Sequence, residues 1–164
     1  MSHVSQGFAV LTVAAALCSP AAAQGVVTQK NISLGLAQSI AQAALDKCIS
    51  MGFKVAVSVV DRGGLVLVTL RGDGAGIHTT EGAERKAYTA RTFGQTSSDL
   101  IKRLAERSET AFGTRQYSRV IALPGGIPIK VGNEVIGAVG VSGSPGKDDD
   151  CSQAGIDKVA DQLK

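Results

Sequence analysis

Aromatic residues are scarce in this sequence, which has no tryptophan, two tyrosines and four phenylalanines among 164 residues. It also has no run of lysine and arginine, and its formal net charge is only +3. Proteins that bind nucleic acids rely on clustered cations and on aromatic rings that stack against bases. We therefore expect no nucleic-acid partner. We also expect a core built from alanine, valine, isoleucine and leucine.

Histidine is scarce as well, and its scarcity excludes several kinds of site. The chain has only His3 and His78, and His3 falls in a segment that we expect to be removed. A zinc site with two or three histidines cannot be built from the remaining one, and no H-E-x-x-H motif is present. A G-x-S-x-G elbow, a Walker A loop and a G-x-G-x-x-G turn after a strand are also missing. These absences disfavour hydrolase and nucleotide-binding chemistry.

The sequence also lacks an apolar run long enough to span a bilayer, because residues 8–18 are too few. Ser19-Pro20 ends this run, and residues 21–23 are alanines that fit a cleavage site, so we predict a secretory signal peptide at residues 1–23. Residues 24–164 would then form one periplasmic or secreted domain. The first seven residues contain no lysine or arginine, so a disordered apolar N-terminus or a mischosen start codon is the alternative.

Cysteine is rare too, and outside the predicted signal peptide only Cys48 and Cys151 are left. In an oxidising compartment they could form one disulfide, and otherwise they would be two buried thiols. Both lie in predicted terminal helices that we expect to cover the same face of a sheet. We predict a strained or partial bridge at best.

The spacing of apolar residues predicts an α+β domain in the order α-β-β-α-α-β-β-α, with helices flanking an antiparallel sheet. Short turns at 61–64 and 132–133 indicate hairpins, which make the sheet antiparallel. The segment 111–119 is polar and is predicted to be irregular. The predicted helices are 33–51, 78–93, one starting at Thr96 or Ser97, and 151–163; the predicted strands are 53–60, 65–70, one ending at Val131, and 134–142.

The predicted helix at 78–93 is the first place to look for a site. Its apolar stripe is only alanine, at positions 83, 87 and 90, so its polar residues are not simply a solvated face. His78 at its start could be a metal or haem-iron ligand, or a surface residue beside the helix cap. Glu81 and Glu84, one turn apart, could bind a cation with it, or could only stabilise the helix dipole.

Three cationic residues and two glycines are further candidates for contacts with a ligand. Arg85, Lys86 and Arg91 could pair with an anionic ligand, or could solvate the helix. Gly125 and Gly126 could expose backbone on which a flat ligand rests, or could form an ordinary turn.

Three blocks of the sequence resemble the GlcG/HbpS-like haem-binding family, and the resemblance covers residues 33–163. They are His-Thr-Thr-Glu-x-Ala-x-Arg-Lys-Ala-Tyr-Thr-Ala at 78–90, Leu-Pro-Gly-Gly-Ile-Pro-Ile at 123–129 and Val-Ile-Gly-Ala-Val-Gly-Val-Ser-Gly at 135–143. The resemblance implies a profilin-like layered sandwich, homo-oligomers from dimer to octamer, and binding of haem or another tetrapyrrole. It carries over His78 as the motif's histidine, Glu81 as its first glutamate, and Lys86-Ala87-Tyr88 as its core.

We therefore expect an exported protein that binds haem, another tetrapyrrole or iron for capture, buffering or redox sensing, with a membrane sensor as a further partner that the resemblance implies. No Cys-x-x-Cys-His motif is present, so haem would be held non-covalently. The alternative is a small-molecule lyase, isomerase or oxidoreductase acting on a hydroxy acid or an aromatic compound. In that enzyme His78 would be the acid or base, and a cation would hold the substrate's carboxylate.

Overall fold

The structure, a computed structural model, describes residues 25–164. The predicted signal peptide at 1–23 lies outside these residues. In the described part, no helix has both the length and the apolar character needed to cross a membrane.

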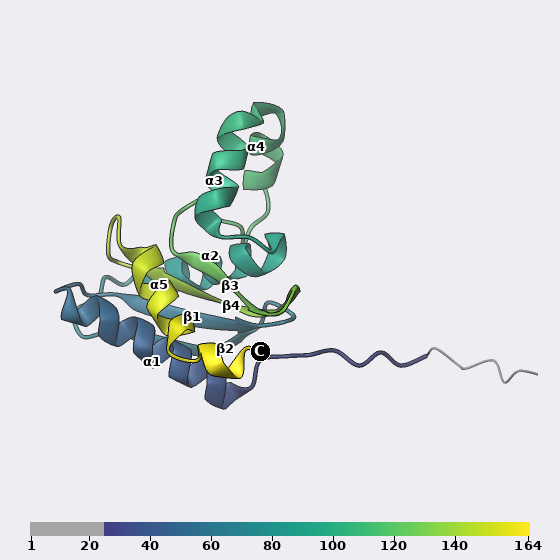
Figure 1. The fold of residues 1–164 in the computed structure, drawn as a ribbon. Coiled ribbons are helices and arrows are strands. Elements are labelled where there is room, and N and C mark those ends of the chain that lie inside the picture. Colours follow the sequence, from purple (N-terminus) through teal and green to yellow (C-terminus); the bar gives the residue numbers. More distant parts are fainter. Residues whose placement is uncertain (1–24) are drawn as a thin grey trace, which may run out of the picture.

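A four-stranded antiparallel sheet forms the centre of the domain (Figure 1). The hairpin of β1 (Ala56–Asp61) and β2 (Val66–Arg71) joins the hairpin of β3 (Gly126–Val131) and β4 (Glu134–Ser142), giving the order β2-β1-β4-β3. The central strands β1 and β4 are almost fully buried, because helices cover both faces of the sheet. This arrangement confirms the predicted α+β layered sandwich with its two hairpins.

Helices α1 (Leu34–Ser50) and α5 (Asp148–Asp157) pack against each other on one face of the sheet, and a short 3-10 turn (Ala160–Gln162) follows α5. Helix α2 (Thr79–Phe93) covers the other face, over β1, β3 and β4. Alanine on α2 faces glycine on the sheet: a Cβ at Gly140 would overlap the carbonyl oxygen of Ala83 and the amide of Ala87. The alanine stripe therefore does bring this helix close to the sheet.

A disulfide joins α1 to α5 through Cys48 and Cys151, whose Cα atoms are 5.6 Å apart. This separation lies within the ordinary range for bridged cysteines. The prediction of a partial bridge at best is therefore corrected: the two helices do cover the same face, and they bring the two side chains within bonding distance.

Two helices depart from the body of the domain. Helices α3 (Ser97–Glu106) and α4 (Ser108–Arg115) form a hairpin that projects away from the sheet (Figure 1). Residues 111–115 were predicted to be irregular and belong to α4 instead. Helix α4 has no buried face that would give it an apolar period, so the sequence pattern did not reveal it.

Candidate functional site

His78 lies immediately before α2, exposed, and its side chain makes no capping bond to the helix. Residues 78, 81, 82 and 85 share one side of the helix start, because residues three, four and seven apart lie on one face. Together with the loop before β3 and the end of β4, they enclose a hollow of about 200 Å³. Its lining residues are His78, Glu81, Gly82, Arg85, Ile121, Leu123 and Ser142.

Arg85 is the cation of this hollow. One terminal nitrogen donates to the carboxylate of Glu81 at 3.2 Å, and the other donates to the carbonyl oxygen of Val120 at 3.0 Å. Its Nε is buried and has no hydrogen-bond partner among the described residues. A buried donor without an acceptor costs stability, whereas the two terminal nitrogens of this guanidinium are both paired.

Glu81 and Glu84 do not form a joint cation site with His78. Glu81 pairs with Arg85, whereas Glu84 accepts a hydrogen bond from Arg119 at 3.1 Å on the neighbouring side of the helix. Within residues 25–164, no group of three or more His, Cys, Asp or Glu side chains is placed to hold a metal ion. The geometry thus does not support a metal site formed by His78, Glu81 and Glu84, because the two carboxylates form ion pairs with different arginines.

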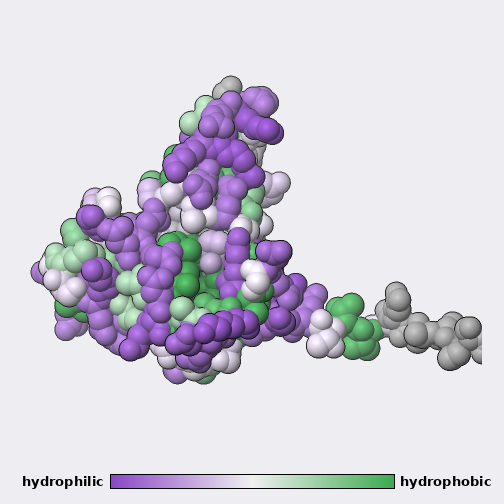
Figure 2. Space-filling view, viewed as in Figure 1, coloured by the Kyte–Doolittle hydropathy of each residue, from purple (hydrophilic) through white to green (hydrophobic). Residues whose placement is uncertain are grey.

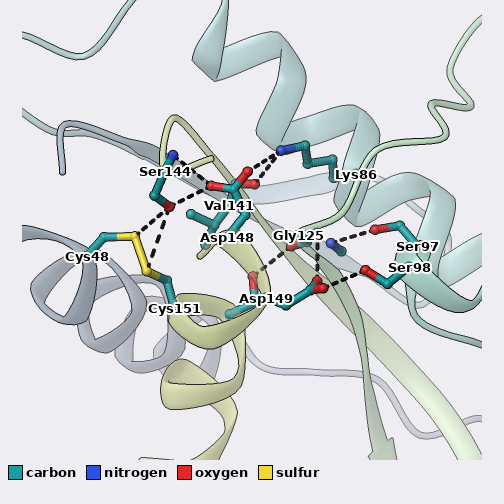
Figure 3. A network of polar contacts seen from close by, with 12 residues as sticks. Cys48, Lys86, Ser97, Ser98, Gly125, Val141, Ser144, Asp148, Asp149 and Cys151 are labelled. Atoms are coloured by element: carbon teal, nitrogen blue, oxygen red, sulfur yellow. Dashed lines mark hydrogen bonds and ion pairs between the residues drawn. A yellow bond between two sulfur atoms is a disulfide. The ribbon is translucent and has the colours of Figure 1, made fainter. Parts of the chain in front are cut away.

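Lys86 was predicted either to pair with an anionic ligand or to solvate the helix. Both predictions are wrong, because the side chain is buried in the domain. Its side chain is only 4% exposed. Its Nζ donates to Asp148 Oδ2 at 2.7 Å and to the carbonyl oxygen of Val141 at 3.0 Å (Figure 3). The alanine stripe contains the signal that was missed: position 86 is three residues after Ala83 and four before Ala90, so it faces the sheet.

Asp148 extends this buried network toward the disulfide (Figure 3). Its Oδ1 accepts hydrogen bonds from the backbone nitrogen of Ser144 at 2.9 Å and from the hydroxyl of Ser144 at 2.6 Å. That hydroxyl lies 3.1 Å from the Sγ atom of Cys48. The sequence had shown only three aspartates at a helix start, and nothing in that pattern distinguished a buried aspartate from solvated ones.

Gly125 and Gly126 are buried and do not offer free backbone to a flat ligand, which corrects that prediction. The amide of Gly125 donates to Asp149 at 2.7 Å, and the amide of Gly126 donates to Ser97 at 2.9 Å. A Cβ at Gly126 would overlap the backbone carbonyl of Lys86. Gly126 is required because β3 passes directly against the backbone of α2, whereas a Cβ at Gly125 would overlap the carbonyl oxygen of Val141 and the Cβ of Asp148.

The remaining candidates lie apart from His78. Arg91 lines a different hollow, together with Gln29, Asn31, Arg62 and Gly63. Tyr88 lines another, whose other walls are Thr92, Phe93, Tyr117, Ser118, Arg119 and Val120. Of the predicted binding residues, the structure thus brings His78 and Arg85 together, with Glu81 beside them.

The fold and the hollow at His78 define a small α+β domain with an accessible imidazole and a half-buried guanidinium at the start of one helix. The chain belongs to the family described as "Haem degrading protein HbpS-like", whose model matches residues 32–157. The resemblance noted in the sequence is thereby confirmed.

Individual relatives agree with this assignment. GlcG of Escherichia coli K12 is 30% identical over 115 residues, which are 70% of this chain and 84% of GlcG. A crystal structure of Streptomyces reticuli HbpS with two glutamate-to-aspartate substitutions is 36% identical, with a TM-score of 0.76 over 85% of this chain and 95% of that one. A crystal structure of a PduOC:heme complex is 25% identical, with a TM-score of 0.71 over 78% of this chain and 94% of that one.

Proposed function

We propose that this protein is an exported, non-covalent haem- or tetrapyrrole-binding protein that captures or buffers its ligand or senses redox state through it. The observation that carries the proposal is the exposed His78 at the rim of a hollow that also holds Arg85. The haem-related description of the family and the haem bound in the PduOC neighbour support the ligand class.

The imidazole of His78 fits the role of an axial ligand. Haem iron accepts a neutral imidazole nitrogen, and His78 is the one histidine in residues 24–164. Its ring is exposed and makes no capping bond to α2, so ligation would not cost the helix a cap.

The size of the hollow indicates how a porphyrin would lie. At about 200 Å³ it is smaller than the roughly 300–1,000 Å³ of pockets that enclose a small-molecule ligand. The ring would therefore lie across the mouth of the hollow rather than inside it. The half-exposed Ile121 and Leu123 supply apolar surface for one face of the ring.

Arg85 fits the role of a propionate partner. Carboxylates bind guanidinium through strong, often bidentate hydrogen bonds, and the Arg85 side chain lines the hollow and is 32% exposed. Glu81 competes for this guanidinium from a side chain that is 72% exposed. An incoming propionate could displace such an exposed carboxylate at small cost, because exposed ion pairs are weak.

Export is supported by two independent features. Residues 1–23 have the pattern of a signal peptide. The Cys48–Cys151 bridge is of a kind that persists in oxidising compartments and is rare in the cytosol. A periplasmic or secreted haem binder of this kind could report to a membrane sensor.

The test is titration of the purified protein with haemin, followed through the Soret band. His78→Ala should weaken binding at least about tenfold, which is about 1.4 kcal/mol, and should shift the Soret band. Thr92→Ala changes an exposed residue near the other end of α2 and should leave both unchanged. Glu81→Gln should tighten binding at low salt, since it releases Arg85 for a propionate.

If His78→Ala matches the wild type in affinity and Soret position, the axial assignment is wrong. The acid/base enzyme would then become the stronger interpretation, and its test is turnover of hydroxy acids without any tetrapyrrole.

A further inference from the structure

Three of the six aromatic residues of the chain meet at one hollow, on a different part of α2 from His78. Tyr88, Phe93 and Tyr117 line a hollow of about 370 Å³ at the base of the projecting α3–α4 hairpin. We call it the aromatic pocket; its other walls are Thr92, Ser118, Arg119 and Val120. Its volume falls within the range of about 300–1,000 Å³ that is typical of small-molecule sites.

One wall of the aromatic pocket is fixed in place. The guanidinium of Arg119 stacks over the ring of Tyr88, with its central carbon 3.9 Å from the ring centroid. Arg119 is itself held by hydrogen bonds to the carbonyl oxygen of Gly64 at 3.0 Å and to Glu84 at 3.1 Å. A Cβ on Gly64 would come within 3.1 Å of the same ring. Tyr88 is therefore a fixed wall of the pocket, and a preorganised wall lowers the entropic cost of binding.

Tyr117 forms a second wall and differs from the first. It is 65% exposed and lies in the chain that leaves α4. Exposed side chains change rotamer on the fastest timescales of protein motion, so this ring is free to adjust to a ligand. An adjustable aromatic wall beside a fixed one suits a flat ring.

The charge around the aromatic pocket favours an anion. The guanidinium of Arg103 lies 5.5 Å from the centroid of the Phe93 ring. The segment from 97 to 119, which includes the hairpin, carries five cationic and three acidic side chains. Because Arg119 is already paired with Glu84, we assign the anionic group to Arg103, which contacts the pocket residue Phe93 although it is not itself a lining residue.

We propose that the aromatic pocket binds small planar aromatic carboxylates, at a site separate from the one at His78. The two hollows share no lining residue. The hydrogen bond from Arg85 to the carbonyl oxygen of Val120 lies between them and ties the intervening loop to α2. This proposal goes beyond haem binding and does not depend on it.

The composition of the chain allows ligand binding at this pocket to be followed by tyrosine fluorescence. Both tyrosines, Tyr88 and Tyr117, line the aromatic pocket, and the chain has no tryptophan, so its intrinsic emission arises beside this pocket. Benzoate is the probe; cyclohexanecarboxylate keeps the charge but loses the flat ring, and benzyl alcohol keeps the ring but loses the charge. We expect benzoate to change the tyrosine emission saturably and to bind at least about fivefold more tightly than either comparator.

Variants measured by titration calorimetry complete the test. Tyr117→Leu should weaken benzoate binding at least about fivefold. Arg103→Gln should remove the preference for benzoate over benzyl alcohol. Phe112→Leu is the matched control, since Phe112 is an exposed aromatic of the same hairpin that does not line the pocket, and it should bind benzoate as the wild type does.

Three results would overturn the proposal. They are equal affinity for the three probes, benzoate binding that survives Tyr117→Leu unchanged, and tyrosine emission that changes with protein concentration alone. The last result would mean that a second copy of the chain fills the pocket. Because His78→Ala should leave benzoate binding intact, failure of this proposal can be told apart from failure of the haem proposal.

Discussion

Lys86 is a charged residue on the side of α2 that otherwise consists of small, uncharged residues. Its ammonium group is held between Asp148 and the carbonyl oxygen of Val141, in an ion pair whose side chains are 4% and 10% exposed. Burying two charges is expensive, and their attraction offsets that expense only when both partners are present. This pair therefore locks α2 to the start of α5 through the middle of the domain.

Lys86→Met should be strongly destabilising, because it leaves the carboxylate of Asp148 buried without its cation. We expect a loss of about 3–5 kcal/mol in the free energy of unfolding, measured by urea denaturation. A double variant that adds Asp148→Asn should recover part of this loss, since the amide oxygen can still accept from Ser144. A single variant within about 1 kcal/mol of the wild type would contradict the structural role and return Lys86 to the list of candidate ligand contacts.

Gly126 shows how closely α2 and β3 approach each other. A methyl group at this position would overlap the backbone carbonyl of Lys86, which cannot move without shifting the helix. We expect Gly126→Ala to cost at least about 3 kcal/mol, at the upper end of overpacking effects.

Gly113→Ala is the matched control for this substitution. Gly113 lies in α4, and a Cβ there would meet no atom within 4 Å. This change should be neutral or should stabilise by up to about 1 kcal/mol, because alanine favours the helix. Thermal unfolding of the two variants side by side would show whether close packing, rather than glycine flexibility, explains position 126.

At the scale of secondary-structure elements, the disulfide closes the larger part of the chain into a covalent loop. Cys48 and Cys151 are 103 positions apart in the sequence, so the bridge closes a loop that contains all four strands. In the chain-entropy description, a loop of about 100 residues corresponds to roughly 4.7 kcal/mol of stabilisation.

We expect the double variant Cys48→Ala/Cys151→Ala to lose about 2–5 kcal/mol of unfolding free energy. Dithiothreitol should lower the stability of the wild type and leave that of the double variant unchanged. Thiol counting under denaturing, non-reducing conditions should find no free thiol in residues 24–164. Two free thiols per chain would show that the bridge does not form.

The sequence predicted the elements that have a strong apolar period and missed the one without it. The two hairpins, α1 and α2 could be read from alternating or helical spacing and from glycine turns. Helix α4 could not, because it buries no stripe. For the candidate site, the position of His78 could be predicted, since it begins a helix whose start signals are local.

Contacts between distant segments could not be predicted in the same way. The pairings of Lys86 with Asp148 and of Glu84 with Arg119 join residues 62 and 35 positions apart. Only the folded sheet brings these segments together, so a charge that looked free in the sequence proved to be paired. The aromatic pocket escaped notice for the same reason.

At the scale of the whole molecule, the sheet with α1, α2 and α5 forms a layered body, from which the α3–α4 hairpin projects (Figure 1). Figure 2 shows hydrophobic surface gathered in the angle between the α3–α4 hairpin and the body, while the hairpin itself is largely hydrophilic on this face. Large apolar side chains elsewhere are exposed as well, including Phe112 at 74% on α4 and Leu65 at 64% beside β2. These exposed side chains are apolar surface that a second copy of the chain can cover.

We therefore expect a homo-oligomer with closed point-group symmetry, in which exposed apolar side chains such as Phe112 lie in the contact and the aromatic pocket stays open. Light scattering coupled to size exclusion should return a multiple of the chain mass at micromolar concentration. Phe112→Ser should shift the distribution toward the monomer, whereas Lys164→Ser, a change at an exposed terminal residue, should not. A wild-type protein that elutes with the mass of one chain at these concentrations would rule out self-association, and the exposed apolar side chains would then require a different partner.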